Sequence, residues 1–177
     1  MLETPGPTID ELSLNPEVFA AHFPSGTITE ISPEVLPDSL IQTIKHKKGS
    51  VAFAISYADG SKTLGVTGGF GGKIHIEDFD KNDRPTGNGN IQPDHIDEIG
   101  LPIIGFSSTA KKLRRKGLGR QRLLVMNALS HMFFGMPLRS SSYQELPPHL
   151  AIWERLEREG KAEKYPGLKM TRYRFTI

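Results

Sequence analysis

The chain contains no cysteine among its 177 residues. Disulfide bonds, thiol nucleophiles and zinc sites built on thiolates are therefore excluded. No apolar run approaches the roughly 20 residues that a membrane-spanning helix needs. The first residues, Met1 to Pro5, lack the basic region and apolar core of a secretory signal. We therefore expect a cytoplasmic protein that does not enter a membrane.

An excess of charge of one sign is also missing, because 22 Lys and Arg against 20 Asp and Glu leave a net charge of only +2. The charges are nevertheless unevenly placed. Basic residues crowd into one short segment: Lys111, Lys112, Arg114, Arg115, Lys116, Arg120 and Arg122. This segment suits an anionic ligand, whereas an acidic stretch between Glu77 and Glu98 favours a solvated loop over a cation site.

The residue types of a metal site occur near that acidic stretch. His75 and Glu77 are two residues apart, and Asp94 and His95 follow later. Their spacing matches no specific metal motif, so we expect no metal.

The composition, with 37% hydrophobic and 24% charged residues, predicts an ordinary globular protein. We expect an N-terminal arm over 1–25, with a short helix from Asn15-Pro16 to Phe23, and one α/β (α+β) domain over 26–177. The hydrophobic patterns predict strands over 27–31, 51–57, 62–67, 73–79, 99–107, 138–142 and 170–177. They predict helices over 33–47, interrupted near Pro37, and over 117–134 and 147–159.

The segment 80–94 is dense in Asn, Asp, Gly and Pro, which predicts a long loop. Loops of that length without structure of their own are often functional. Its glycine-rich middle, 86–90, is expected to move as a lid.

The run Arg114-Arg115-Lys116-Gly117-Leu118-Gly119 lies between a predicted strand and a predicted helix. Glycines at such a junction let the backbone approach a ligand. The free N–H groups and positive dipole end of the following helix can hold a pyrophosphate. A second candidate phosphate loop, 67–74, has Thr67 where the first Gly of a P-loop belongs and Ile74 where Ser or Thr is required, so we reject it.

This run resembles the signature of the GNAT superfamily of N-acetyltransferases, Arg/Gln-x-x-Gly-x-Gly/Ala between the fourth strand and the third helix. Trp153, Leu156 and Gly160 resemble the family's later helix, which carries an aromatic residue, a Leu and a closing Gly. The resemblance implies a GNAT-like central mixed, mostly antiparallel sheet flanked by helices. It also implies transfer of an acyl group from acetyl-CoA, or another acyl-CoA, to an amine on an acceptor of unknown size: a small molecule, a protein or a nucleic acid.

The same resemblance implies the cofactor-binding residues. The strand ending near Thr109 would pair with the pantetheine arm, and one of its amides would polarise the thioester carbonyl. The residues so implicated are Ser107, Thr109, Arg114, Arg115, Lys116, Gly117, Leu118, Gly119 and Arg120. A non-enzymatic phosphate- or nucleic-acid-binding module using 111–122 is the alternative. No aromatic residues interleave with the basic ones, which disfavours nucleic acid.

For catalysis we expect a carboxylate base and identify Glu98, at the entry to the strand before the signature. An exposed strand-end carboxylate is the competing interpretation, and Glu77 or Glu145 would then take the role. Many family members carry a Tyr as general acid on the later helix, where this chain has Trp153, which cannot donate a proton in this way. Tyr143 is therefore our candidate acid, with Ser142 beside it, and Trp153 is expected to pack in the core rather than to shape an acyl pocket.

Overall fold

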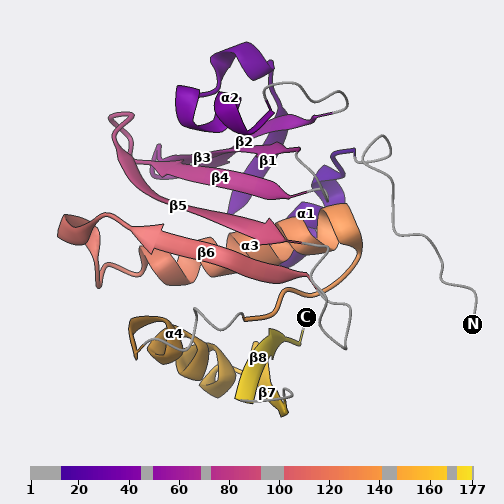
Figure 1. Ribbon diagram of the computed structural model, residues 1–177, viewed down its shortest axis with the longest axis vertical. Helices are drawn as coiled ribbons and strands as arrows, with labels where there is room; N and C mark the ends of the chain where they lie inside the picture. The colour runs from indigo at the N-terminus through magenta and orange to yellow at the C-terminus, as the bar shows by residue number, and fades with distance from the viewer. Residues whose placement is uncertain are drawn as a thin grey trace, which may run out of the picture.

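The computed structural model describes residues 13–44, 50–68, 73–92, 102–140, 147–166 and 171–176. Figure 1 shows a broad sheet with helices on both faces and a smaller unit of α4, β7 and β8 beside β6. The helices are α1 (Pro16–His22), the 3-10 helix η2 (Pro33–Val35), α2 (Asp38–Ile44), the 3-10 helix η3 (Lys111–Leu113), α3 (Leu118–Phe134) and α4 (Pro147–Arg158). The strands are β1 (Gly26–Glu30), β2 (Ala52–Tyr57), β3 (Lys62–Thr67), β4 (Ile74–Phe79), β5 (Pro85–Gln92), β6 (Ile103–Thr109), β7 (Ala162–Pro166) and β8 (Thr171–Phe175). Within this described part, no helix is both long and apolar enough to cross a membrane.

Strands β1 to β6 form one six-stranded sheet in sequential order, and each pairs antiparallel with the next. Arg139, which follows α3, forms a parallel bridge with Ile103 at the start of β6 and an antiparallel bridge with Arg174 of β8. The β7–β8 hairpin is thereby joined to the main sheet. The predicted mixed, mostly antiparallel sheet flanked by helices is confirmed.

Local signals in the sequence set the ends of several elements. Asn15 caps α1 by accepting a hydrogen bond from the Val18 N–H (3.3 Å), and Pro16 follows it in the first turn. Asp59 and Gly60 form the β2–β3 turn, in which Gly60 has a φ of +83°. Gly135 ends α3 in the left-handed conformation, with a φ of +66°.

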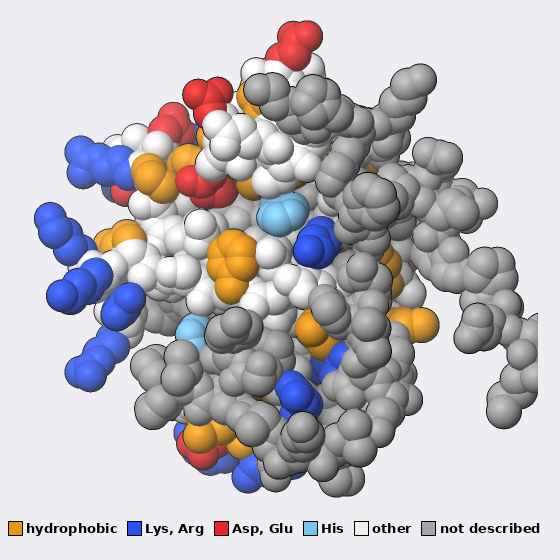
Figure 2. All heavy atoms as spheres, viewed as in Figure 1, with side chains coloured by type: hydrophobic (Ala, Val, Ile, Leu, Met, Phe, Trp, Pro, Cys, Tyr) orange, Lys and Arg blue, Asp and Glu red, His pale blue; other side chains and the backbone are white. Residues whose placement is uncertain are grey.

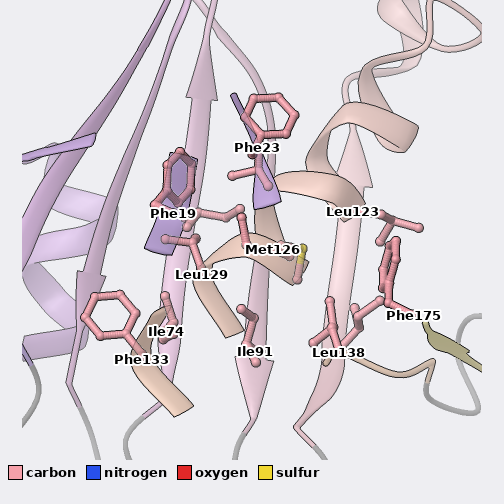
Figure 3. Packing of buried hydrophobic residues seen from close by; sticks show 14 of the residues in the cluster. Phe19, Phe23, Ile74, Ile91, Leu123, Met126, Leu129, Phe133, Leu138 and Phe175 are labelled. Atoms are coloured by element: carbon pink, nitrogen blue, oxygen red, sulfur yellow. The ribbon is translucent and has the colours of Figure 1, made fainter. Parts of the chain in front are cut away.

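The main core lies between the sheet and the two helices α1 and α3 (Figure 3). Phe19 from α1 and Leu129 from α3 pack over Ile74 and Ile91 of the sheet, and all four are almost fully buried. A second, smaller cluster packs the α2 region on the opposite face, where Leu36, Leu40, Ala52 and Val66 meet. Core clusters form on both faces of the sheet because successive side chains of a strand point to opposite faces. Phe53 of β2 therefore joins the main core, and Ala52 joins the second cluster.

The predicted loop over 80–94 is wrong, because Pro85–Gln92 forms strand β5, which pairs on both sides, with β4 and with β6. Gly and Asn alternate from Gly87 to Asn90, and the glycines lie on the face that α3 covers. Their lack of side chains makes room for α3 residues, so this segment is a packed strand and not a lid.

The predicted interruption of the helix over 33–47 near Pro37 is confirmed, because Pro37 separates η2 from α2. Two other elements differ from expectation. In place of the predicted strand over 138–142, Arg139 forms isolated bridges to β6 and β8. The Ser140 N–H donates to the Tyr173 carbonyl (2.8 Å), and the Leu138 carbonyl accepts from the Phe175 N–H (3.0 Å). Strand β7, which follows the left-handed Gly160, was not predicted.

Candidate functional site

The turn from β6 into α3 exposes a row of free backbone donors. Gly117 is left-handed (φ +81°) and is followed directly by the first helical residue, Leu118. The Gln121 N–H donates to the Gly117 carbonyl at 3.0 Å. The N–H groups of residues 117–120, which precede it, have no acceptor in the described part of the chain. A left-handed residue followed by a right-handed one directs successive N–H groups to one point, which makes an anion-binding nest at the positive end of α3.

Space and charge around this nest also suit an anion. A Cβ built on Gly117 meets no atom within 4 Å, so the nest faces open space. Figure 2 shows Lys and Arg side chains gathered at the end of the molecule where β6 passes into α3. The exposed members of this basic loop are Lys111, Lys112, Arg114, Arg115 and Lys116.

The outer edge of β6, which faces away from β5, pairs with Arg139 at its start and with no further strand among the described residues. At the start of β6, the Ile104 N–H donates to the Arg139 carbonyl at 3.2 Å. At its far end, the Ala110 N–H points the other way and donates to the carbonyl of Thr86 in β5 (2.9 Å). Because backbone groups alternate along a strand, those of Ser107 and Thr109 point to the outer edge. No strand among the described residues pairs there.

A β-bulge marks the point where this free edge begins. Ile91 pairs with Ile104 and Asn90 with Phe106, which leaves Gly105 as the extra residue of β6. The Asn90 Oδ1 accepts the hydrogen bond of the Phe106 N–H (3.2 Å) and so supports the bulge from β5. A bulge bends its strand, and here it lies just beyond the bridge to Arg139.

Helix α4 borders the nest on the side of α3. A Cβ on Gly119 would lie 3.1 Å from Ile152 Cδ1, so a larger residue there would require the Ile152 side chain to shift. Arg120 forms an ion pair with Glu159, just beyond α4, which also accepts a hydrogen bond from Arg155 (3.0 Å). The first turn of α3 is thereby held against the middle and the C-terminal end of α4.

The strand-to-helix turn therefore carries the Arg114–Gly119 run, with a free strand edge, a parallel neighbour at Arg139 and helix α4 around it. These are the surroundings that the resemblance to the GNAT superfamily predicts for this run. One departure from the expected GNAT pattern is that the signature follows the sixth strand rather than the fourth.

The chain is similar to several solved structures, among them the following two. A presumed acyl-CoA N-acyltransferase from Klebsiella pneumoniae subsp. pneumoniae MGH 78578 is 16% identical, with a TM-score of 0.42 over 84% of this chain and 94% of that one. An IAA acetyltransferase from Bacillus cereus ATCC 14579 is 15% identical, with a TM-score of 0.34 over 85% of this chain and 96% of that one. No protein-family model and no curated protein matches the chain. Likenesses this distant carry no functional argument, so function must be inferred from the geometry of the chain itself.

The predicted cofactor residues come together, but they act in different ways. Ser107 and Thr109 turn their hydroxyls inward to Arg122 Nη1, at 3.3 and 3.1 Å, so only their backbone groups face the outer edge. The Arg114 Nε lies 3.4 Å from the Thr109 carbonyl. Arg115 is left-handed (φ +67°), and the Arg120 side chain is committed to Glu159, which leaves its backbone N–H for a ligand.

The two predicted catalytic residues, Glu98 and Tyr143, lie outside the described residues, as do Ser142 and Glu145. Glu77 lies on β4 and accepts a hydrogen bond from the Ser39 hydroxyl of α2 (2.5 Å). No group of three or more His, Asp or Glu within the described ranges is arranged to hold a metal ion, and Asp94 and His95 fall outside those ranges.

Trp153 belongs to the core, as expected. Its side chain is fully buried and stacks on Tyr173, with ring centroids 5.8 Å apart. The indole Nε1 has no hydrogen-bond partner in the described part of the molecule. Trp153 therefore stabilises the packing of α4 on β8 and offers no proton to a leaving group.

His149 is a site residue that sequence reasoning missed. It lies in the first turn of α4, three residues before Ile152, and is half-buried. Burial lowers its pKa, and the nearby guanidinium groups of Arg114 and Arg122 lower it further. A neutral imidazole therefore lies between α4 and the β6–α3 turn. No partner for it could be assigned from sequence, because both arginines are more than 25 residues away along the chain.

A cavity of about 390 Å³ lies on the α3 side of the sheet, between the start of α3 and the tips of the β2–β3 and β4–β5 hairpins. Its lining includes three carboxylates and three cations: Asp59, Asp78, Asp80, Lys62, Lys81 and Arg122. Tyr57, at its floor, has a raised pKa because it is buried, so the hydroxyl stays protonated. The mixed charge of this cavity suits a phosphate less well than the nest does, and the outer edge of β6 lies away from it.

Proposed function

We propose that this protein is an acyl-CoA-dependent N-acyltransferase, with acetyl-CoA as the first donor to test. The observation that carries the proposal is the nest of free N–H groups at Gly117, which opens to space beside the free outer edge of β6. A pyrophosphate and an amide-bearing arm are the two parts of coenzyme A that these two features fit.

Different residues of the chain bind different parts of acyl-CoA. Backbone amides from Gly117 to Arg120 hold the pyrophosphate, and the exposed basic loop adds charge that accelerates the encounter. The outward backbone groups of Ser107 and Thr109 pair with the pantetheine arm as a further strand would. An amide of β6 near the bulge then donates to the thioester oxygen as charge develops on it.

The reaction that follows from this placement is direct attack by a neutral amine on the thioester carbonyl carbon. A C–N bond forms, the C–S bond breaks, and the amine gives up one proton as the thiolate leaves. We assign the proton acceptor to Glu98, which enters the strand before the nest in the sequence. Tyr143 is the proposed donor to the thiolate.

Binding and turnover test this function separately. Calorimetry should show that coenzyme A and acetyl-CoA bind, and either ligand should raise the melting temperature, since it binds only the folded state. Thiol release from acetyl-CoA, measured over a panel of small amines, peptides and nucleic acids, would identify the acceptor. A chain that binds no coenzyme A would refute the proposal, and binding without thiol release on any acceptor would leave a cofactor-binding module instead.

The base assignment is tested by two matched variants. Glu98→Gln should lower turnover by about 10²-fold or more, the usual contribution of a general base, while acyl-CoA still binds. Glu77→Gln should leave turnover near the wild-type value, because that carboxylate is engaged by Ser39. The reverse pattern would move the role to Glu77.

A further inference from the structure

A row of polar residues crosses the sheet below the first turns of α3. Thr63, Asp78, Gly87 and Thr109 lie directly opposite one another on the successive strands β3 to β6. Three of the four side chains can form hydrogen bonds, but Gly87 leaves a gap between Asp78 and Thr109. Neighbouring strands lie about 4.8 Å apart, so these two side chains, two strands apart, cannot meet directly.

Arg122 fills that gap from α3. Its Nε donates to Asp78 Oδ2 at 2.6 Å, and its Nη1 donates to Thr109 Oγ1 at 3.1 Å and to Ser107 Oγ at 3.3 Å. The side chain is fully buried. The guanidinium lies over the backbone of Gly87, where a Cβ would come within 1.9 Å of Nη2.

The far end of the row is also tied down. Asp78 Oδ1 accepts a hydrogen bond from the Thr63 hydroxyl (2.6 Å), and the Thr63 and Tyr57 hydroxyls are 2.7 Å apart. Arg122 is therefore anchored through Asp78 to three inner strands of the sheet. A buried charge is costly to leave unpaired, so this anchor holds the guanidinium in one position.

The residues that Arg122 holds on the other side belong to the proposed cofactor edge. Ser107 and Thr109 turn their hydroxyls inward to the guanidinium and their backbone groups outward, to the edge on which the pantetheine arm would pair. Resting on the proposed function, we infer that Arg122 is a positioning residue, which sets the outer edge of β6 for acyl-CoA without touching the ligand.

Two variants that make the same chemical change at the two ends of the row test this inference. Thr109→Val removes the hydroxyl that Arg122 holds on the cofactor strand. Thr63→Val removes the matching hydroxyl from the anchor, at a side chain that is more deeply buried than Thr109. Both should lower the melting temperature of the ligand-free protein. Only Thr109→Val should weaken acyl-CoA binding, by about tenfold, because small displacements of a supporting element can cost up to about 10²-fold.

The KM for acyl-CoA should rise in Thr109→Val with little change in kcat, and Thr109→Ser, which keeps the hydroxyl, should restore it. Arg122→Lys keeps the charge beside Asp78 but cannot reach two acceptors on β6 with a planar fork. If Arg122 acts through Thr109, the affinity losses of Arg122→Lys and Thr109→Val will overlap in the double variant rather than add.

The outcomes separate this inference from the proposed function. If the wild type binds acyl-CoA and Thr109→Val binds it equally well, or Thr63→Val loses as much affinity, the positioning role is wrong and the proposed function stands. If the wild type binds no acyl-CoA, both are wrong.

Discussion

Gly87 of β5 provides the space in which the guanidinium of Arg122 lies, since a Cβ at position 87 would come within 1.9 Å of Arg122 Nη2. The glycine on one strand and the arginine on a helix therefore depend on each other. Substituting either should disturb both the buried ion pair with Asp78 and the strand that carries the candidate site.

Gly87→Ala should accordingly lower the free energy of unfolding by at least about 2 kcal/mol, in the range of overpacked cores. Gly89→Ala should cost less, because a Cβ there would lie 3.0 Å from the Phe106 carbonyl and 3.4 Å from Met126 Sδ. Urea denaturation of both variants, with exposed Asn88→Ala as the control, measures the difference. Equal midpoints for all three would contradict the packing described here.

The nest is tested by placing the same side chain at both ends of α3. Gly117 and Gly135 are both left-handed, with φ values of +81° and +66°, and a Cβ at either position meets nothing within 4 Å. Glutamate at each should therefore cost a similar strain of about 1–2 kcal/mol. Only Gly117→Glu should abolish the rise in melting temperature with coenzyme A, because its carboxylate would lie among the amides that hold the pyrophosphate. Loss of that rise in Gly135→Glu as well would point to a general effect on folding.

His149 should make stability depend on pH. Its folded-state pKa lies below the usual 6.5, because of burial and then because of Arg114 and Arg122. Between these two values the unfolded chain binds a proton that the folded chain does not, so stability falls as the pH drops through 6.5. Above pH 7 the group is neutral in both states and contributes nothing to this dependence.

His149→Gln should therefore lose less stability than the wild type between pH 7.5 and pH 5, measured by urea denaturation. Acyl-CoA bound as proposed would place negative charge near Arg114, which would oppose the effect of the arginines and raise the His149 pKa. Binding at pH 6.5 should then take up protons in the wild type, seen as a dependence of the calorimetric heat on the buffer. Identical pH profiles for the two proteins would show that His149 does not titrate as inferred.

Trp153→Phe should preserve turnover, because the indole packs in the core and its Nε1 has no hydrogen bond to lose within the described structure. The stability cost should be about 1–2 kcal/mol, below the about 3–5 kcal/mol expected for Trp153→Ala. Steady-state kinetics with thermal denaturation tests both statements. A large fall in kcat for the Phe variant at an unchanged melting temperature would instead give the indole a direct role.

Much of the fold was predictable because the signals are local. Asn15-Pro16, Asp59-Gly60 and Gly135 set element ends through contacts within a few residues, and the alternation of β2, β3 and β4 needs only the strand itself. The Arg114–Gly119 run is also local, since the nest is made by its own backbone. The position of the candidate cofactor site could therefore be predicted before the structure.

Strand β5 was not predicted, because its Gly and Asn content is typical of a loop. Glycine and asparagine favour turns when only neighbours along the chain are considered. In the sheet, Gly87 and Gly89 instead alternate with Asn88 and Asn90, and the glycines lie under Arg122 and Met126. Glycine was needed for a contact made by α3, which no local pattern could show.

The sequence by itself determined where the nest at Gly117 lies and which strand leads into it, because backbone conformation follows from residues adjacent in the chain. The partners of Arg122 were decided only by the tertiary structure. Arg122 lies beside Val125, Met126 and Leu129 on the buried face of α3. Asp78 follows Ile74 and Ile76 at alternate positions of β4. Each charged group is therefore placed among apolar residues. The two are 44 residues apart, and only the ordered pairing of β4, β5 and β6 under α3 brings them to 2.6 Å. A buried charge requires a partner. The sequence does not show which residue that partner is, because the packing of α3 on the sheet decides it.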